Sequence, residues 1–147
     1  MQIKFKRLNG RACAPRYAHH DDACFDMTVV TDDPGETVVI KPRQTVVFGT
    51  GVAFEIPEGH VMKMYVRSSV GIKKNLVLSN GTGIIDAGYR GEVRIALTNI
   101  GNRPEIVTDG NRIAQCEICP VNQVSFLETD ELSESGRGTG GIGSSGK

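Results

Sequence analysis

The side chains best suited to chemistry lie in a glycine-rich segment around Asp86, Asn80-Gly81-Thr82-Gly83-Ile84-Ile85-Asp86-Ala87-Gly88-Tyr89. A lone carboxylate beside a tyrosine can orient and deprotonate a water molecule. The Asn-Gly and Thr-Gly pairs predict a tight hairpin whose edge backbone is free to pair with a flat ligand. An aspartate in a glycine-rich turn more often caps the backbone, so the segment by itself leaves catalysis and a structural turn open.

A second segment, Val66-Arg67-Ser68-Ser69-Val70-Gly71, combines an arginine and two hydroxyls at the end of an expected strand. The only helical pattern in the sequence, residues 68–74, begins there. We expect Ser68 to cap this helix and Asn75 to end it in a left-handed conformation. Free amides at a helix start and a guanidinium group both favour anions. The segment predicts either an anion site or an ordinary capped turn.

A third polar segment follows the turn Asp109-Gly110-Asn111 and carries Arg112 and Gln115. Successive side chains alternate between the two faces of a strand, so residues three apart are expected on opposite faces. We therefore expect one of these two side chains to have a structural partner and the other to reach a ligand.

Residues 133–147 differ in composition from the rest of the chain: six glycines and four serines surround Ile142, the one large apolar side chain. Such a segment cannot build a core, and we expect a mobile tail. The same residues suit a phosphate-clasping loop, because glycine amides, hydroxyls and the charges of Arg137 and Lys147 all bind phosphate oxygens. The predicted division is a β-barrel domain of residues 1–132 and a flexible glycine-rich lid of residues 133–147.

The elements that must position these segments are short strands. Apolar residues alternate at residues 3–5, 38–40, 46–48, 52–56, 62–66, 93–97 and 113–118. Turn-forming segments such as Asp33-Pro34-Gly35 and Pro57-Glu58-Gly59 separate these runs. Many short strands with frequent turns predict an all-β sandwich or barrel.

Charge and hydropathy exclude several classes of partner. Lys and Arg (17) balance Asp and Glu (17), so no overall field attracts a nucleic-acid backbone. The start of the chain does not resemble a signal peptide, and no apolar run is long enough to cross a bilayer. We expect a cytoplasmic protein without nucleic-acid or membrane partners.

The cysteines carry a weaker signal. Cys116 and Cys119 have the spacing of half a zinc or redox site, but residues three apart on a strand face opposite sides. Cys13 and Cys24 lie too far apart to form the other half. We expect buried, reduced cysteines.

The order and spacing of the polar segments resemble the five motifs of the homotrimeric deoxyuridine triphosphate pyrophosphatases (dUTPases), from Tyr17 to Lys147. The matching segments are Ala23-Cys24-Phe25-Asp26-Met27, Arg67-Ser68-Ser69, Gly83-Ile84-Ile85-Asp86-Ala87-Gly88-Tyr89-Arg90-Gly91-Glu92, Gly110-Asn111-Arg112-Ile113-Ala114-Gln115 and the tail. The resemblance implies a jelly-roll-like, distorted β-barrel with one short helix. It also implies a homotrimer in which two subunits form each pocket and the third supplies its tail as a lid.

The resemblance implies Mg²⁺-dependent hydrolysis of dUTP to dUMP and pyrophosphate, which keeps uracil out of DNA and supplies dUMP for thymidylate synthesis. Asp86 would activate the water that attacks the α-phosphorus. Tyr89 would pack under the deoxyribose and exclude UTP. The Asn80 amide and the backbone around Gly83 and Ile85 would pair with uracil and leave no space for a 5-methyl group.

The same resemblance implies ligands for the phosphates and the metal. Arg67, Ser69 and Gln115 would hold the α and β phosphates, and Arg137 the γ phosphate. The expected substrate-binding set is completed by Ser68, Ile142, Gly143 and Ser144. Asp26 would anchor Mg²⁺ through water, with the triphosphate as the direct ligand. A Mg²⁺ ion that keeps several waters needs few protein carboxylates.

Four positions depart from the family pattern. Cys24 stands where glycine is frequent, Asn111 where an acidic residue is common, and Gly88 where an aspartate often precedes the tyrosine. Ile142 replaces the usual tail phenylalanine that stacks on uracil. Stacking is worth about 1–3 kcal/mol per base, so we expect a working enzyme whose lid closes less firmly.

Three other interpretations compete with a dUTPase. A dCTP deaminase shares the fold, but it needs a general acid/base beside the exocyclic amine, where this chain offers Asp86 and Tyr89 instead of a Glu and Trp pattern. A dUTP-gated regulatory protein with a protein partner is compatible with the unusual tail. A plain structural β-domain would leave five ordered polar motifs as a coincidence.

Overall fold

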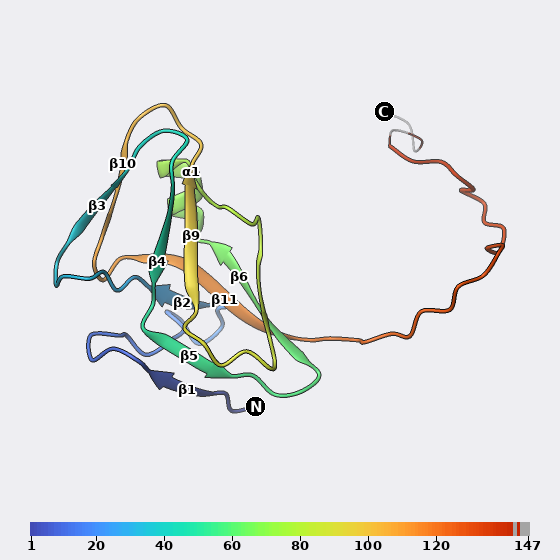
Figure 1. The fold of residues 1–147 in the computed structure, drawn as a ribbon, viewed down its shortest axis with the longest axis horizontal. Helices are drawn as coiled ribbons and strands as arrows, with labels where there is room; N and C mark the ends of the chain where they lie inside the picture. The colour runs from blue at the N-terminus through green and yellow to red at the C-terminus, as the bar shows by residue number, and fades with distance from the viewer. Residues whose placement is uncertain (143, 145–147) are drawn as a thin grey trace.

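The chain forms short strands and a single short helix. The computed structural model describes residues 1–142 and residue 144, and this part contains eleven strands and one helix (Figure 1). In chain order these are β1 (Lys4–Arg7), β2 (Phe25–Thr28), β3 (Thr37–Ile40), β4 (Thr45–Gly49), β5 (Val52–Glu55), β6 (His60–Val66), α1 (Ser68–Lys74), β7 (Leu76–Leu78), β8 (Gly83–Asp86), β9 (Arg94–Asn99), β10 (Glu105–Thr108) and β11 (Arg112–Pro120). The all-β class predicted from the alternating residues is confirmed.

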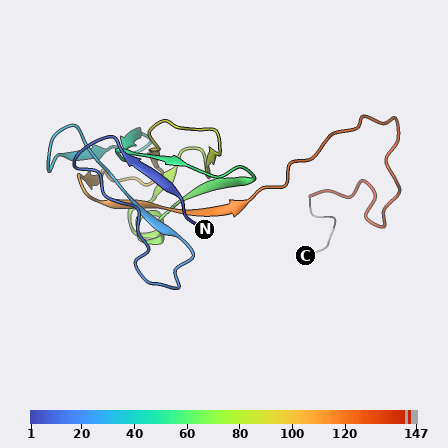
Figure 2. The same ribbon diagram turned by 90° about the horizontal axis from the view of Figure 1, so that it is seen from below.

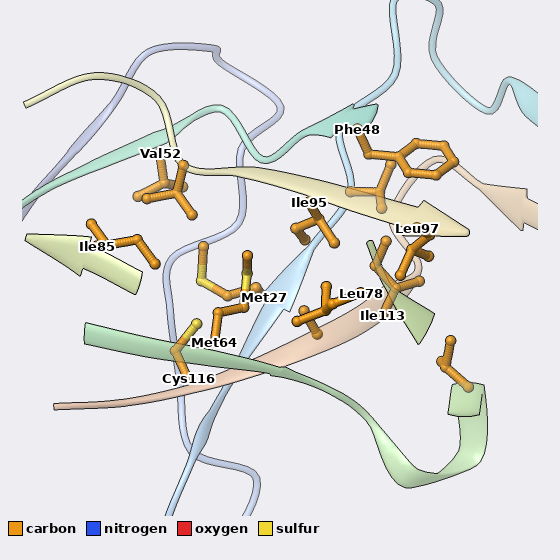
Figure 3. Packing of buried hydrophobic residues seen from close by; sticks show 14 of the residues in the cluster. Met27, Phe48, Val52, Met64, Leu78, Ile85, Ile95, Leu97, Ile113 and Cys116 are labelled. Carbon is orange, nitrogen blue, oxygen red and sulfur yellow. The ribbon is translucent and has the colours of Figure 1, made fainter. Parts of the chain in front are cut away.

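Two antiparallel sheets enclose the core. One contains β2, β11, β6 and β8 in that order, the other β4, β9 and β7, and β1–β5 and β10–β3 form two further pairs. Met64 and Cys116 of the first sheet and Ile95 and Leu97 of β9 belong to one buried core layer between the sheets (Figure 3). Full burial of an apolar side chain contributes about 1.5–3 kcal/mol, so this layer fixes the two sheets against each other. The result is a distorted rather than a closed barrel.

A β-bulge in β11 changes the direction of its polar side chains. Across β2, Arg112 pairs with Thr28, and Ala114 pairs with the adjacent Met27, so β11 carries one extra residue there. The extra residue shifts the alternation of side chains by one position. Arg112 and Gln115 therefore lie on the same face of the sheet, and the prediction that they face opposite sides is wrong.

The turn at Asn80 and Gly81 does not close a hairpin. Strand β7 before it pairs with β9, whereas β8 after it pairs with β6 in the other sheet. The turn passes the chain from one sheet to the other, with Gly81 in the left-handed region at φ 71°. The hairpin prediction is wrong, but the exposed edge that it implied exists, because β8 is the last strand of its sheet.

Helix α1 is as short as predicted but begins differently. Its end at Asn75, with φ 51°, is left-handed as expected. Arg67 occupies the N-cap position in an extended conformation, and the cap has no side-chain hydrogen bond. The Arg67 amide donates a hydrogen bond to the Ile113 carbonyl oxygen at 3.2 Å, which keeps this residue strand-like. Ser68 is consequently the first helical residue, and its predicted capping role is wrong.

All four cysteines are free. Cys116 is completely buried, whereas Cys119 is partly exposed, as predicted for residues three apart on β11. Burial raises the pKa of the Cys116 thiol, which keeps it protonated and unreactive. Cys13 is exposed and Cys24 and Cys119 are partly exposed, so the expectation of burial is confirmed only for Cys116.

After Pro120 the chain leaves the sheets. Residues 121–142 and 144 form neither strand nor helix, and they extend away from the barrel on one side (Figures 1 and 2). Large apolar side chains in this segment, among them Val124, Phe126 and Leu132, are exposed. The irregular segment thus begins before residue 133. Within residues 1–142 and 144, no helix has the length and apolar character needed to cross a membrane.

Candidate active site

Asp86 is the last residue of β8, and its side chain is exposed. It borders an open cleft of about 280 Å³ that is also lined by Asn80, Gly83, Ile85 and Tyr89. The structure therefore brings the carboxylate predicted to activate water into one cleft with the residues predicted to hold uracil and deoxyribose.

Tyr89 is held against the backbone although its side chain is half exposed. Its hydroxyl donates a hydrogen bond to the Glu92 carbonyl oxygen at 2.9 Å, and its amide donates to the Asp86 carbonyl oxygen at 3.0 Å. The ring covers Gly91 so closely that a Cβ atom there would lie 2.5 Å from the tyrosine hydroxyl oxygen. These contacts hold the carboxylate and the ring in a fixed relation.

Strand β8 presents its main chain to the cleft. Among the described strands it pairs with β6 alone, so its outer edge offers amide and carbonyl groups to a planar base. Gly83 permits this position, because a Cβ atom there would lie 2.8 Å from Met64 Cε. Glycine at residue 83 thus lets β8 pack closely on β6.

Two charged residues to which the sequence analysis gave no role also line this cleft. The Glu92 carboxylate accepts a hydrogen bond from the Gly51 amide at 2.7 Å and lies 3.3 Å from Arg94 Nε. Both residues follow Tyr89 within five residues in sequence, and this proximity was the only feature of the sequence that pointed to a place beside the cleft. Their contacts tie the floor of the cleft to the chain that enters β5.

A second polar group lies on the outer face of the four-stranded sheet. The Asp26 carboxylate oxygens lie 2.9 Å from Arg67 Nε and 2.8 Å from Arg112 Nη1. The Asp26 side chain is only 9% exposed. Gln115 of β11 pairs with Asp26 of β2, so the two side chains lie on the same face of the sheet. We call Asp26, Arg67 and Arg112 the arginine cluster; with Gln115, it gathers residues predicted to bind phosphate and metal.

Next to Gln115, the Tyr65 hydroxyl donates a hydrogen bond to the Glu117 carboxylate at 2.7 Å. This hydrogen bond raises the pKa of Tyr65 to about 12 and lowers the pKa of Glu117. At neutral pH Tyr65 is therefore protonated and Glu117 ionised, which leaves a fixed negative charge near Gln115.

Asp86 and Arg67 lie at opposite ends of β6. Asp86 pairs with Val61 near the start of the strand, whereas Arg67 follows its last residue. At about 3.3 Å per residue, the intervening strand separates the two ends by about 20 Å. The exposed Ser68 and Ser69 follow Arg67 at the far end. A water at Asp86 cannot reach a phosphate held by Arg67 of the same chain.

Residues 133–142 of the tail extend away from the sheets (Figure 1). Arg137 Nε donates to the Gly140 carbonyl oxygen at 2.9 Å, and the Ser144 hydroxyl donates to the Gly141 carbonyl oxygen at 2.7 Å. Ile142 is fully exposed. Gly143, also predicted to bind substrate, lies outside the described residues. Among the described tail residues, 133–142 and 144, none lines the cleft of its own chain.

Comparison with known proteins identifies the family. A model of the dUTPase family matches residues 11–146. The chain belongs to the dUTPase family. Its relatives include the deoxyuridine 5′-triphosphate nucleotidohydrolase of Nautilia profundicola, 40% identical over 100% of both chains, and that of a Hydrogenobaculum species, 38% identical over 99% of both.

Solved dUTPases share the fold. A mutant dUTPase of Staphylococcus bacteriophage 80alpha, solved with dUpNHpp, is 31% identical and has a TM-score of 0.89 over 99% of both chains. A mutant dUTPase from phage phi11 of S. aureus, described for its coordination of a structural Mg(II) ion, is 28% identical with a TM-score of 0.80, over 91% of this chain and 100% of that one. The predicted dUTPase-like fold is confirmed.

The residues present fit a magnesium ion only through water. Within residues 1–142 and 144, no three His, Cys, Asp or Glu side chains are placed to hold a metal. Both oxygens of Asp26 already contact arginines. A Mg²⁺ ion that keeps its waters and takes direct ligands from a triphosphate is compatible with this arrangement, because it needs few protein carboxylates.

Proposed function

We propose that this dUTPase family member hydrolyses dUTP to dUMP and pyrophosphate, with Asp86 as the base that activates the attacking water. The observation that carries the proposal is the exposed Asp86 carboxylate at the end of an edge strand, in one cleft with Tyr89 and Asn80. A positioned base and an in-line water suffice for substitution at phosphorus without a covalent intermediate.

The β8 edge and Tyr89 select the base and the sugar. Main-chain groups around Gly83 and Ile85, with the Asn80 amide, pair with uracil much as another base would. The Tyr89 ring, held by its hydrogen bond to Glu92, packs under the deoxyribose and leaves no room for a 2′-hydroxyl. Selection against UTP and dTTP is therefore steric, and it depends on the fixed positions of the Tyr89 ring and the β8 main chain.

The phosphates are held on the opposite side of the substrate. Arg67, Ser68, Ser69 and Gln115 contact the α and β phosphates, and hydrogen bonds to charged oxygens make these contacts strong. When bound, Mg²⁺ neutralises charge on the phosphate oxygens, and Asp26 holds it through water. The tail completes the site with Arg137 on the γ phosphate and residues 142–144 over the base.

A complete site needs more than one copy of the chain. The separation of about 20 Å along β6 keeps Asp86 from Arg67 within one subunit. The tail also extends away from its own sheets (Figure 2). Both observations support a homotrimer in which Asp86 of one copy meets Arg67 of a second, and the tail of a third covers the pocket.

Pyrophosphate release from dUTP and Mg²⁺ tests the proposal. The wild-type protein should release pyrophosphate, and Asp86→Asn should lower kcat by about 10²-fold or more, since a general base contributes that much. Binding of dUpNHpp should persist in the variant. Asp21→Asn changes an exposed carboxylate outside the cleft and serves as the control. Equal rates in wild type and Asp86→Asn would reject the mechanism.

A regulatory use of the same site is the second candidate. A phage 80alpha dUTPase that is 32% identical to this chain is described as controlling transfer of virulence genes by a G protein-like mechanism. A wild-type protein that binds dUpNHpp but releases no pyrophosphate from dUTP would favour this role.

The family match favours a dUTPase over a dCTP deaminase, and release of ammonia from dCTP would contradict that assignment.

A further inference from the structure

Asp26 joins two arginines that belong to different strands. Arg67 follows β6 and Arg112 begins β11, and each places a guanidinium nitrogen within 2.9 Å of one Asp26 oxygen. The carboxylate is nearly buried, whereas the Arg67 and Arg112 side chains are 28% and 41% exposed. One negative charge between two positive charges leaves the cluster positive overall, as an anion site requires.

The ion pair with Asp26 and a hydrogen bond to the main chain determine which part of the Arg67 guanidinium group remains for a ligand. Arg67 Nε lies 2.9 Å from Asp26 Oδ1 in an ion pair, and Nη1 donates a hydrogen bond to the Arg112 carbonyl oxygen at 3.3 Å. The Nη2 group is left to meet a phosphate oxygen. Because a guanidinium is planar and rigid, holding one edge fixes the direction of the other.

Without the carboxylate, the same two arginines would repel each other. Both side chains are partly exposed, so they could relax toward solvent and lose the orientation described above. Binding would then have to order the Arg67 side chain, at a cost in conformational entropy that is avoided when Asp26 already holds it.

We propose that Asp26 is a positioning residue, which holds Arg67 and Arg112 together so that Arg67 is ready to bind phosphate with or without metal. The inference rests on the proposed role of Arg67 in holding the substrate's phosphates. It adds to the role of Asp26 toward Mg²⁺, because both of its oxygens are engaged by arginines in the protein itself.

Charge alone predicts the opposite effect from positioning. Asp26 and Arg112 border an open cleft of about 450 Å³ that is also lined by Arg7 and Arg16. Removing the Asp26 charge makes these surroundings more positive, which by itself would tighten metal-free binding of a triphosphate. If Asp26 positions Arg67, the same substitution weakens that binding.

Binding of dUpNHpp to the full-length protein, titrated in EDTA and again in Mg²⁺, separates these effects. Asp26→Asn keeps the size of the side chain, and we expect affinity to fall by about tenfold or more in EDTA, since bonds to charged groups are worth that much. Unchanged or tighter binding in EDTA, with a loss confined to Mg²⁺, would overturn the positioning role. Failure of the wild type to bind dUpNHpp would instead refute the proposed function.

A second substitution, Arg112→Gln, tests whether repulsion between Arg67 and Arg112 causes the loss of affinity in Asp26→Asn. Arg112→Gln alone should weaken metal-free binding, because it removes a positive charge. Combined with Asp26→Asn, it should partly restore affinity, because the repulsion on Arg67 is relieved. An Arg112→Gln effect of the same sign and size in both backgrounds would show that the residues act independently, and would overturn the proposal. Thermal unfolding of each variant identifies any that does not fold.

Discussion

Tyr89 keeps its position in the cleft because Gly91 has no side chain. The ring lies over residue 91, and its hydroxyl bonds to the Glu92 carbonyl oxygen at 2.9 Å. Neither contact was visible in the sequence, which offered only a tyrosine among glycines. The cause is three-dimensional: the ring folds back over the turn.

We predict that Gly91→Ala displaces the Tyr89 ring without unfolding the protein. The added Cβ atom would meet the outer end of the ring at 2.5 Å, and that half-exposed side chain can swing away. Because we propose that the ring excludes the 2′-hydroxyl, kcat/KM for dUTP should fall by about tenfold or more and discrimination against UTP should fall with it. Gly88→Ala is the matched control, since a Cβ atom there meets nothing within 4 Å. Equal selectivity in both variants would refute this role of Gly91.

At the scale of elements, the turn before β11 is anchored by Asp109. Its carboxylate accepts hydrogen bonds from the Thr31 and Gly35 amides at 3.0 and 3.2 Å and pairs with Arg11 at 3.0 Å. These contacts join the chain before β2, the β2–β3 loop and the β10–β11 turn. Arg112 follows that turn, so the anchor also supports the arginine cluster.

We expect Asp109→Asn to destabilise the protein by about 1–3 kcal/mol at pH 7, because bonds to an ionised group are lost. The Thr31 amide above all holds the pKa of Asp109 below its usual 3.8. A depressed folded-state pKa gives stability that is present above pH 3.8 and is lost as pH falls through the folded value. The gap between wild type and variant in urea unfolding should therefore narrow below pH 3.8.

Asp32→Asn is the control for that series. Asp32 is exposed and lies on the β2–β3 loop that Asp109 contacts. The backbone oxygen of Asp32, rather than its carboxylate, accepts a hydrogen bond from Arg11. The substitution should leave the unfolding free energy nearly unchanged. A gap between wild type and Asp109→Asn that is constant from pH 7 to pH 2 would contradict the proposed linkage.

The alternating pattern predicted the longer strands well, for instance β6 and β11. It did not predict β7, because Leu76, Val77 and Leu78 are all apolar and show no alternation. The bulge at Arg112–Ala114 was also invisible, because it depends on pairing with β2 rather than on residue type. The Asn80-Gly81 pair predicted a turn correctly, but which strands flank a turn and pair is decided by long-range packing.

At the scale of the whole molecule, the residues expected to act together are distributed over three places. Asp86, which borders the cleft with Tyr89, pairs with Val61 near the start of β6, Arg67 follows the end of that strand, and Arg137 is on the tail. The sequence motifs predicted which residues matter but not their separation, which follows from the register of β6 against β8. Under the proposed mechanism, one subunit therefore carries parts of several sites rather than one complete site.

Mixing two inactive variants tests this claim most directly. Asp86→Asn and Arg67→Gln should each lack pyrophosphate release from dUTP as pure proteins. Co-expressed at equal levels and purified together through two different tags, they should recover about a third of wild-type activity, because in each mixed trimer one pocket of three receives both native residues, from different chains. Mixed oligomers that remain as inactive as either parent would contradict a site shared between subunits, and with it the role assigned to Asp86.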